Sequence, residues 1–293
     1  MQYGCKNHRG LIVFAYILQG VKMNDIEILQ DWVISEMIRG RYIFTKEDVR
    51  AIGLPISDEA LINSLVRMRK RGVIMSPWQN FYVTIPTEYK LKGVVPPSFY
   101  MDRLMKYIGR EYYVALLTAA AFEGAGHQRV MVFQTMLNGS SIRSGVKNGT
   151  RLEFTVRKKL PMQFVHKVKT QSGYLNVADA ELTALDIIAE EKKVGGLSRA
   201  AEVLIELSER MKLDETKLPL LEFFTAAVIQ RLGYLLDYIG ELDLSNALYE
   251  LLLKTRKTFR KVPLKQSMPI NQDMTVNERW KIIENYEIEI DEI

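Results

Sequence analysis

The fold is decided by residues 57–85, which read SDEALINSLVRMRKRGVIMSPWQNFYVTI. The stretch opens on a serine N-cap followed by two acids, and Gly72 is a typical helix stop. Between them apolar side chains recur at helical spacing, at Leu61, Leu65 and Met68. After Gly72 two extended apolar runs, 73–75 and 81–85, flank a turn region at 76–80. The stretch therefore predicts a helix followed by a β-hairpin.

The residues before this stretch predict two further helices. Thr45 is a good N-cap for a short helix that closes at Gly53, because two acids lie in its first turn. An earlier amphipathic helix ends near Gly40, and its apolar positions are Ile26, Leu29, Val33 and Met37. Helix, short helix, helix and hairpin follow one another within about 60 residues, which is the order of a winged helix-turn-helix. We assign this domain to residues 24–90.

The third helix carries the groups that could contact DNA. Asn63, Arg67 and Lys70 stand at i, i+4 and i+7, on a face distinct from the apolar one. An amide and two cations can contact base edges and phosphates, although cations in a last helical turn also complement the helix dipole without any ligand. Asp58 and Glu59 either cap this helix and face away or weaken contacts at its base-reading end. The candidate DNA-binding residues are Thr45, Lys46, Ser57, Asn63, Arg67, Arg69, Lys70, Arg71 and Tyr82.

Composition limits the class of protein, and charge is unevenly distributed along it. The 293 residues are 47% apolar and 26% charged, which excludes a disordered, collagen-like or disulfide-rich chain. The net charge of +5 conceals 12 basic against 4 acidic residues in 102–171 and 15 against 22 in 172–293. Such asymmetry suggests a polyanionic or acidic partner for one face. A possible second basic surface comprises Arg129, Arg143, Lys147, Arg157, Lys158 and Lys159.

The start of the chain bears on its location. Residues 11–18 are continuously apolar, but eight residues cannot span a bilayer and no cleavage-site pattern follows. We interpret 1–23 as an extension upstream of a natural start at Met23; a buried N-terminal strand or helix is the alternative, and export is a weaker one. The single cysteine, Cys5, excludes a disulfide framework and a cysteine-based zinc site within one chain, and it fits a reducing cytoplasm. We expect a cytoplasmic protein without a membrane segment.

The remaining residues predict a larger α+β domain. Residues 91–101 are expected to be a linker, because the paired prolines 96–97 oppose both helix and central strand. The domain itself, 102–293, should begin with one long helix over 101–124 and a loop at 138–150. Extended runs are predicted at 130–137, 151–156, 164–168, 174–177 and 280–290, and helices at 179–193, 198–211, 216–239 and 243–258.

No catalytic, metal or cofactor signature stands out, so we expect neither an enzyme nor a cofactor. Gly139-Ser140 followed by Glu153 is superficially like a nucleotidyltransferase, but Thr155 stands where the second metal-binding acid would be needed. The histidines are too far apart for an HExxH-type pair, and no metal site is predicted. If the chain were a nucleic-acid-processing enzyme, Asp186, Glu190 or Glu191 would be the acids involved; we interpret them instead as the solvated face of a helix.

Several segments, in order and spacing, resemble the AbiEi antitoxins of the AbiE (type IV) toxin–antitoxin systems of bacterial abortive infection. The similarity runs from about Ile26 to the C-terminus. Its segments are 71–74 leading into 81–83, then YYVALLTAAA at 112–121, GHQ at 126–128 before VFQ at 132–134, LTALD at 182–186 and QRLGYLL at 230–236.

The resemblance implies a repressor that binds inverted repeats in its own promoter through an N-terminal winged helix. It also implies a C-terminal domain that counteracts a nucleotidyltransferase-like toxin, which is encoded nearby, without requiring a stable complex with it. This phage-defence role agrees with the lack of catalytic residues. The alternative is a winged-helix regulator whose C-terminal domain senses a small molecule.

Overall fold

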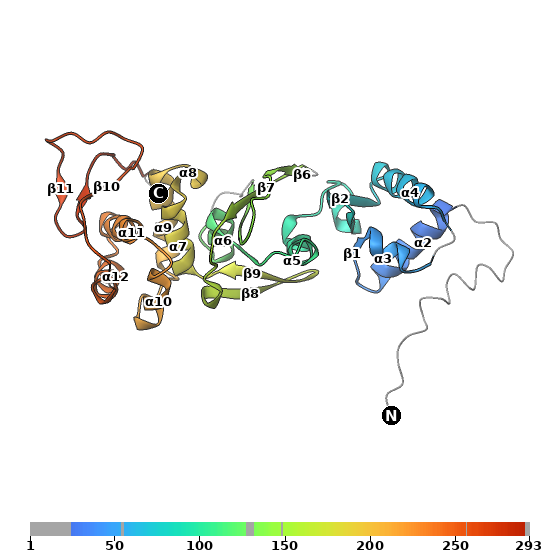
Figure 1. Ribbon diagram of the computed structural model, residues 1–293, viewed down its shortest axis with the longest axis horizontal. Helices are drawn as coiled ribbons and strands as arrows, with labels where there is room; N and C mark the ends of the chain where they lie inside the picture. The colour runs from blue at the N-terminus through green and yellow to red at the C-terminus, as the bar shows by residue number, and fades with distance from the viewer. Residues whose placement is uncertain (1–24, 54–55, 127–131, 148, 256, 291–293) are drawn as a thin grey trace, which may run out of the picture. The chain divides into compact units, whose positions relative to one another are not determined.

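The computed structural model describes residues 25–53, 56–126, 132–147, 149–255 and 257–290 (Figure 1). The chain divides into two compact units. The first comprises 1–109 with the short segments 146–150 and 170–174, and the second comprises the rest. The predicted extension 1–23 and Arg129 lie outside the described residues. None of the helices in the described part of the chain is long and apolar enough to cross a membrane.

The first unit begins with three helices and a three-stranded antiparallel sheet. In chain order these are α2 (Asp25–Ile38), β1 (Ile43–Thr45), α3 (Lys46–Arg50), α4 (Asp58–Lys70), β2 (Ile74–Trp78) and β3 (Phe81–Thr84). The strand order is β1-β3-β2, so β3 is central. A shared core of buried apolar residues includes Leu29, Val33, Phe44, Val49, Leu61, Leu65, Met68 and Ile74. This is the element order that defines a winged helix.

The hairpin turns later than the sequence indicated. A turn region was expected at 76–80, but β2 runs on to Trp78 and the turn consists of Gln79 and Asn80. Asn80 has a φ of 58°, a left-handed conformation that asparagine tolerates better than most residues. The pairing register shifts between Met75 and Trp78, so Ser76-Pro77 forms an irregularity inside the strand.

The predicted linker and the long helix after it are both partly wrong. Within 91–101, Pro97 begins helix α5 (Pro97–Tyr107), because proline is well suited to a first helical position, where no amide hydrogen is needed. The helix expected over 101–124 is three elements: the end of α5, strand β4 (Tyr112–Val114) and helix α6 (Leu116–Phe122). Gly109, with φ of 67°, ends the first, and the Tyr-Tyr-Val run pairs as a buried strand. A short 3₁₀ turn, Thr87–Tyr89, precedes α5.

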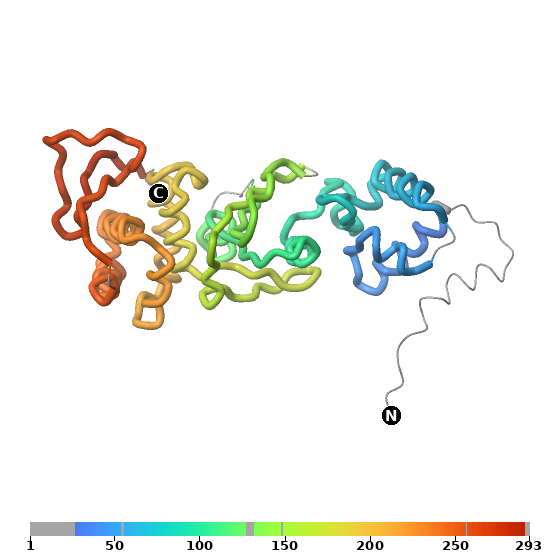
Figure 2. The backbone as a smooth tube through the Cα atoms, in the orientation of Figure 1, coloured from blue at the N-terminus to red at the C-terminus, as the bar shows by residue number. Residues whose placement is uncertain are grey.

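A six-stranded mixed sheet, most of whose residues belong to the second unit, has the strand order β6-β7-β5-β4-β9-β8. Its further strands are β5 (Val132–Leu137), β6 (Gly145–Lys147), β7 (Thr150–Val156), β8 (Val165–Thr170) and β9 (Gly173–Ala178). Strand β5 is antiparallel to β4 and parallel to β7, and Figure 2 follows the backbone through these strands. The extended runs predicted within 130–177 are confirmed where the structure describes them, and β6 lies inside the expected loop 138–150.

Helices follow the sheet in sequence, and the α+β class is confirmed. They are α7 (Ala180–Ala189), α8 (Glu191–Val194), α9 (Leu197–Ser208), α10 (Leu218–Leu221), α11 (Ala226–Tyr238) and α12 (Leu242–Lys254), with a 3₁₀ turn at Glu215–Lys217. The single helix predicted over 216–239 is broken, since Thr225 accepts a hydrogen bond from the Val228 amide and caps a new helix there.

The last predicted strand, 280–290, is wrong in extent. Strand β12 covers only Ile282–Ile283, between β10 (Val262–Pro263) and β11 (Val276–Asn277). Beyond it the Asn285 amide donates hydrogen bonds to the carbonyls of Lys265 and Met268. Side-chain bonds to a loop thus replace the ladder that the alternating pattern had predicted.

Candidate nucleic-acid interface

Helix α4 is held so that one side faces the core and the other faces outward. The Ser57 hydroxyl accepts a hydrogen bond from the Ala60 amide and fixes the start of the helix. The buried side consists of Leu61, Ser64, Leu65 and Met68. Because these residues recur at helical spacing, the positions between them must point away from the core.

The outward side brings together the cations that the sequence suggested. Arg67, Arg69 and Lys70 are exposed in the last turn of α4, Arg71 follows as its C-cap, and Asn63 lies one turn earlier. None of the four cations has a carboxylate partner among the described residues. An exposed amide and four unpaired cations on one helix end form a surface that suits a polyanion.

The acid at the start of α4 is neutralised. Asp58 accepts hydrogen bonds from the Arg50 guanidinium through both carboxylate oxygens, with Nε to Oδ1 at 3.1 Å. This bond from Arg50 lowers the pKa of Asp58, although both side chains lie in solvent. Ser57 provides the cap, so Asp58 is neither the cap nor an unpaired repulsive charge.

Among the other candidate DNA-binding residues, Thr45 and Tyr82 have structural roles. Thr45 and Asp48 form a reciprocal capping box, in which the Asp48 amide donates to Thr45 Oγ1 at 3.1 Å and the Thr45 amide donates to Asp48 Oδ2 at 2.8 Å. Tyr82 is half-buried, and its ring stacks on Phe44 at 5.4 Å between centroids. Burial raises the pKa of Tyr82, and the nearby Arg69 cation opposes that rise. Lys46 is partly exposed at the start of α3.

Only part of the second set of basic residues is fully exposed. Arg143, Lys158 and Lys159 are exposed, whereas Lys147 belongs to the first unit and lies over the Trp78 ring at 5.7 Å. Arg157 is a correction: its side chain is 16% exposed because it reaches inward to a buried carboxylate.

That carboxylate is Asp186, which the sequence had placed on a solvated helix face. It is fully buried, and it lies 2.6 Å from Arg157 Nη2. The Tyr113 hydroxyl donates to Asp186 Oδ2 at 2.9 Å and accepts a bond from Arg157 Nη1 at 3.2 Å. Burial raises the pKa of Asp186 to about 6, against the opposing effect of Arg157. Helix 180–189 is apolar on nearly every side, which could have signalled that its one aspartate is buried.

A second network of bonded polar side chains lies on the same sheet. The Gln134 amide donates to Glu153 Oε2 at 2.9 Å and to the Lys193 carbonyl at 3.1 Å. Lys193 Nζ donates to the Thr155 hydroxyl at 2.9 Å and pairs with Glu190 at 2.8 Å. These bonds link strands β5 and β7 to α8, and Lys193 in turn to Glu190, which lies between α7 and α8. Glu153 and Thr155, considered above for a metal clamp, are thus engaged in internal bonds.

No cluster of three or more histidine, cysteine or acidic side chains suited to a metal lies within the described ranges. The prediction that the protein is not an enzyme stays a prediction.

The fold defines the class of the protein: an α+β chain whose first described elements follow the order of a winged helix. Comparison with solved structures agrees with this class. The chain is similar to the crystal structure of the RV2827C protein from Mycobacterium tuberculosis, with a TM-score of 0.63 and 15% sequence identity, over 86% of this chain and 89% of that chain. At this identity the similarity concerns the fold. No curated protein sequence is significantly similar to the chain.

Residues 113–238 match the family described as the AbiEi antitoxin C-terminal domain. This match identifies the segment as similar to the AbiEi antitoxin C-terminal domain, and it supports a role as the antitoxin of a toxin–antitoxin system. The resemblance stated from the sequence is therefore confirmed over residues 113–238. The matched range includes Tyr113, Gln134, Arg157 and Asp186, which form the buried polar groups just described.

Proposed function

We propose that this antitoxin binds its own promoter DNA through α4 and represses its operon. The observation that supports this most directly is the cluster of unpaired cations at the end of α4, within a winged-helix order of elements. One or two cations would suffice to complement the helix dipole. Four of them together with Asn63 provide contacts for both phosphates and base edges.

The antitoxin's target is, in this proposal, a nucleotidyltransferase-like toxin encoded beside it. The family match lies in 113–238, outside α4, so the surface for DNA and the domain that opposes the toxin are separate parts of the chain. The proposed DNA target is the inverted repeats of the promoter, and the proposed action against the toxin needs no stable complex between the two proteins. Arg143, Lys158 and Lys159 remain candidates for an additional polyanion contact.

The test is a gel-shift titration with the DNA upstream of the operon at several salt concentrations. The double variant Arg67→Ala with Lys70→Ala should bind more weakly by at least about 1–3 kcal/mol, since an arginine contact alone contributes that much. Its salt dependence should be shallower, because each lost phosphate contact reduces the slope of log K against log salt by about 0.9.

The matched control is Arg260→Ala with Lys261→Ala, which removes the same two charges from exposed positions of the second unit. This variant should bind DNA as the wild type does. Equal affinity and slope for the α4 variant and the wild type would reject α4 as the DNA-contacting helix.

A further inference from the structure

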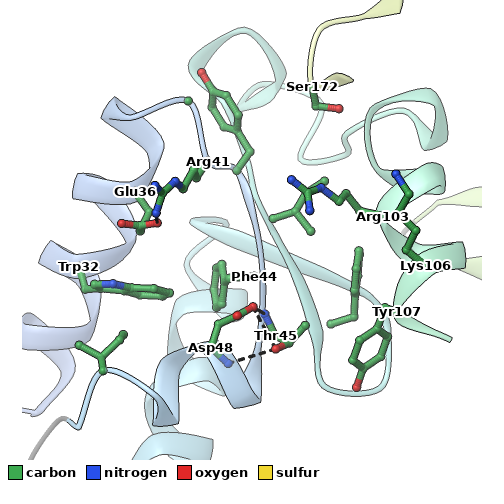
Figure 3. Close-up of a pocket in the computed structure, with 15 residues that line it drawn as sticks. Trp32, Glu36, Arg41, Phe44, Thr45, Asp48, Arg103, Lys106, Tyr107 and Ser172 are labelled. Carbon is green, nitrogen blue, oxygen red and sulfur yellow. Dashed lines mark hydrogen bonds and ion pairs between the residues drawn. The ribbon is translucent and has the colours of Figure 1, made fainter. Parts of the chain in front are cut away.

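The first unit contains a hollow of about 540 Å³ that the functions above do not use. It lies between α2 and β1 on one side and α5 on the other (Figure 3). No residue of α4 lines it. Its volume is in the range of pockets that hold small ligands, about 300–1,000 Å³.

Aromatic side chains form both sides of the hollow. Trp32 and Phe44 meet edge to face, with ring centroids 5.3 Å apart and planes at 85°. On the side of α5, Tyr107 contacts Phe81 at 5.5 Å between centroids. Figure 3 shows Trp32 and Phe44 on one side of the space and Tyr107 on the other. A flat ring placed between them would find aromatic partners on two sides.

One cation at the hollow lacks a counter-charge. Arg41 pairs with Glu36 at 3.1 Å, and Lys106 pairs with Asp102 at 2.6 Å. Arg103 is exposed, points from α5 into the hollow in Figure 3, and has no hydrogen-bond or ion-pair partner within the described part of the chain.

The acids that line the same space are already engaged. Glu36 accepts bonds from both Arg39 and Arg41, and Asp48 belongs to the capping box of α3. Arg103 is therefore free to bind an anionic group from outside, and its planar guanidinium suits a carboxylate or phosphate in a bidentate geometry.

We infer that this hollow binds a small ligand with a flat aromatic body and a single anionic group. The ring would lie between the Trp32–Phe44 pair and Tyr107, and the anion would pair with Arg103. Duplex DNA alone does not fit this arrangement as well, because its bases are stacked inside the helix and its backbone offers no flat ring to the aromatic side chains.

Saturation-transfer NMR and calorimetry on the full chain test this inference. The probes are salicylate and adenosine monophosphate; the matched compounds without charge are benzyl alcohol and adenosine, and those without a ring are acetate and inorganic phosphate. At least one of the two probes should bind, more tightly than its uncharged and ringless counterparts. Preference for salicylate would identify a carboxylate ligand, and preference for the nucleotide a phosphate.

Variants locate the site. Arg103→Ala should weaken binding about tenfold or more, the loss expected for a charge-assisted hydrogen bond. Tyr107→Ala should also weaken it, while Arg151→Ala, an exposed arginine of the second unit, should not. The inference is overturned if neither probe binds at millimolar concentration, if the uncharged compounds bind equally well, or if Arg103→Ala binds as the wild type does. Loss of DNA binding in Arg103→Ala without binding of either probe would assign the hollow to the DNA surface instead.

Discussion

At the scale of single residues, Asp186 shows how burial and pairing compete. Desolvation disfavours its charged form, while Arg157 and the Tyr113 hydroxyl favour it. Burial has the larger effect, because the pKa of Asp186 lies at about 6, above its ordinary value of 3.8. The carboxylate is therefore charged and paired at neutral pH, at a cost to the folded state.

The sign of the pH dependence follows from that shift. Between pH 3.8 and about 6 the folded chain holds a proton on Asp186 that the unfolded chain has lost, so this group's contribution to stability falls as pH rises. Asparagine mimics the protonated acid and does not titrate. The test is urea unfolding at intervals from pH 4 to 7. Over this range the free energy of unfolding of Asp186→Asn should rise relative to that of the wild type by on the order of 2–3 kcal/mol, at about 1.4 kcal/mol per pH unit.

Asp243→Asn, an exposed aspartate of α12, is the matched control and should show no such trend. A difference between wild type and Asp186→Asn that stays constant with pH, or that favours the wild type as pH rises, would contradict the raised pKa.

At the scale of elements, one glycine of α11, Gly233, allows a tryptophan to pack closely against this helix. The ring of Trp280 is fully buried and lies against the backbone at Gly233, and its indole N–H donates to Asp237 on the same helix at 2.8 Å. A Cβ at position 233 would lie 2.1 Å from the Trp280 ring. Gly233 thus allows the segment after 276 to pack closely on α11, which glycine's lack of a side chain permits.

Gly233→Ala should lower the free energy of unfolding by about 1–3 kcal/mol, the usual cost of overpacking. In an uncrowded helix interior the same change would stabilise by up to about 1 kcal/mol. The measurement is urea unfolding followed by circular dichroism. Gly145→Ala is the control, since a Cβ there meets nothing within 4 Å and its backbone is not left-handed. A neutral or stabilising Gly233→Ala would show that Trp280 can move aside at little cost.

At the scale of the whole molecule, the two proposed tasks, DNA binding and action against the toxin, belong to different parts of the chain. The exposed cations of α4 lie in the first unit, whereas the antitoxin domain match starts at residue 113. If these parts act independently, removing surface charges from α4 should leave the core of the second unit intact, because exposed substitutions seldom change stability by more than about 0.5 kcal/mol.

A co-expression experiment tests this separation. Arg67→Ala with Lys70→Ala, expressed from an unrelated promoter together with the proposed toxin, should rescue growth as the wild type does. The same variant should leave a reporter under the native promoter derepressed. Growth rescue lost together with repression, at equal protein levels, would show that the two tasks share the α4 surface.

The sequence by itself determined the features that depend on neighbours along the chain. The N-caps Thr45 and Ser57, the apolar spacing of α4 and the change of period after Gly72 are local, so they predicted the winged-helix order correctly. The cations of α4 were predicted for the same reason, since residues at i, i+4 and i+7 of a helix share a face.

The tertiary structure decided what depends on distant partners. The neighbouring sequence predicted that Tyr112–Val114 is part of a helix, but these residues form a strand because they pair with β5 and β9. The sequence predicted a solvated Asp186, but this residue is buried and pairs with Arg157, which lies 29 positions earlier in the chain. Arg103 is a candidate ligand-binding residue because α5 lies across a hollow from Trp32 and Phe44. Packing brings these residues together, and packing energy depends on three-dimensional neighbours that a one-dimensional pattern does not specify.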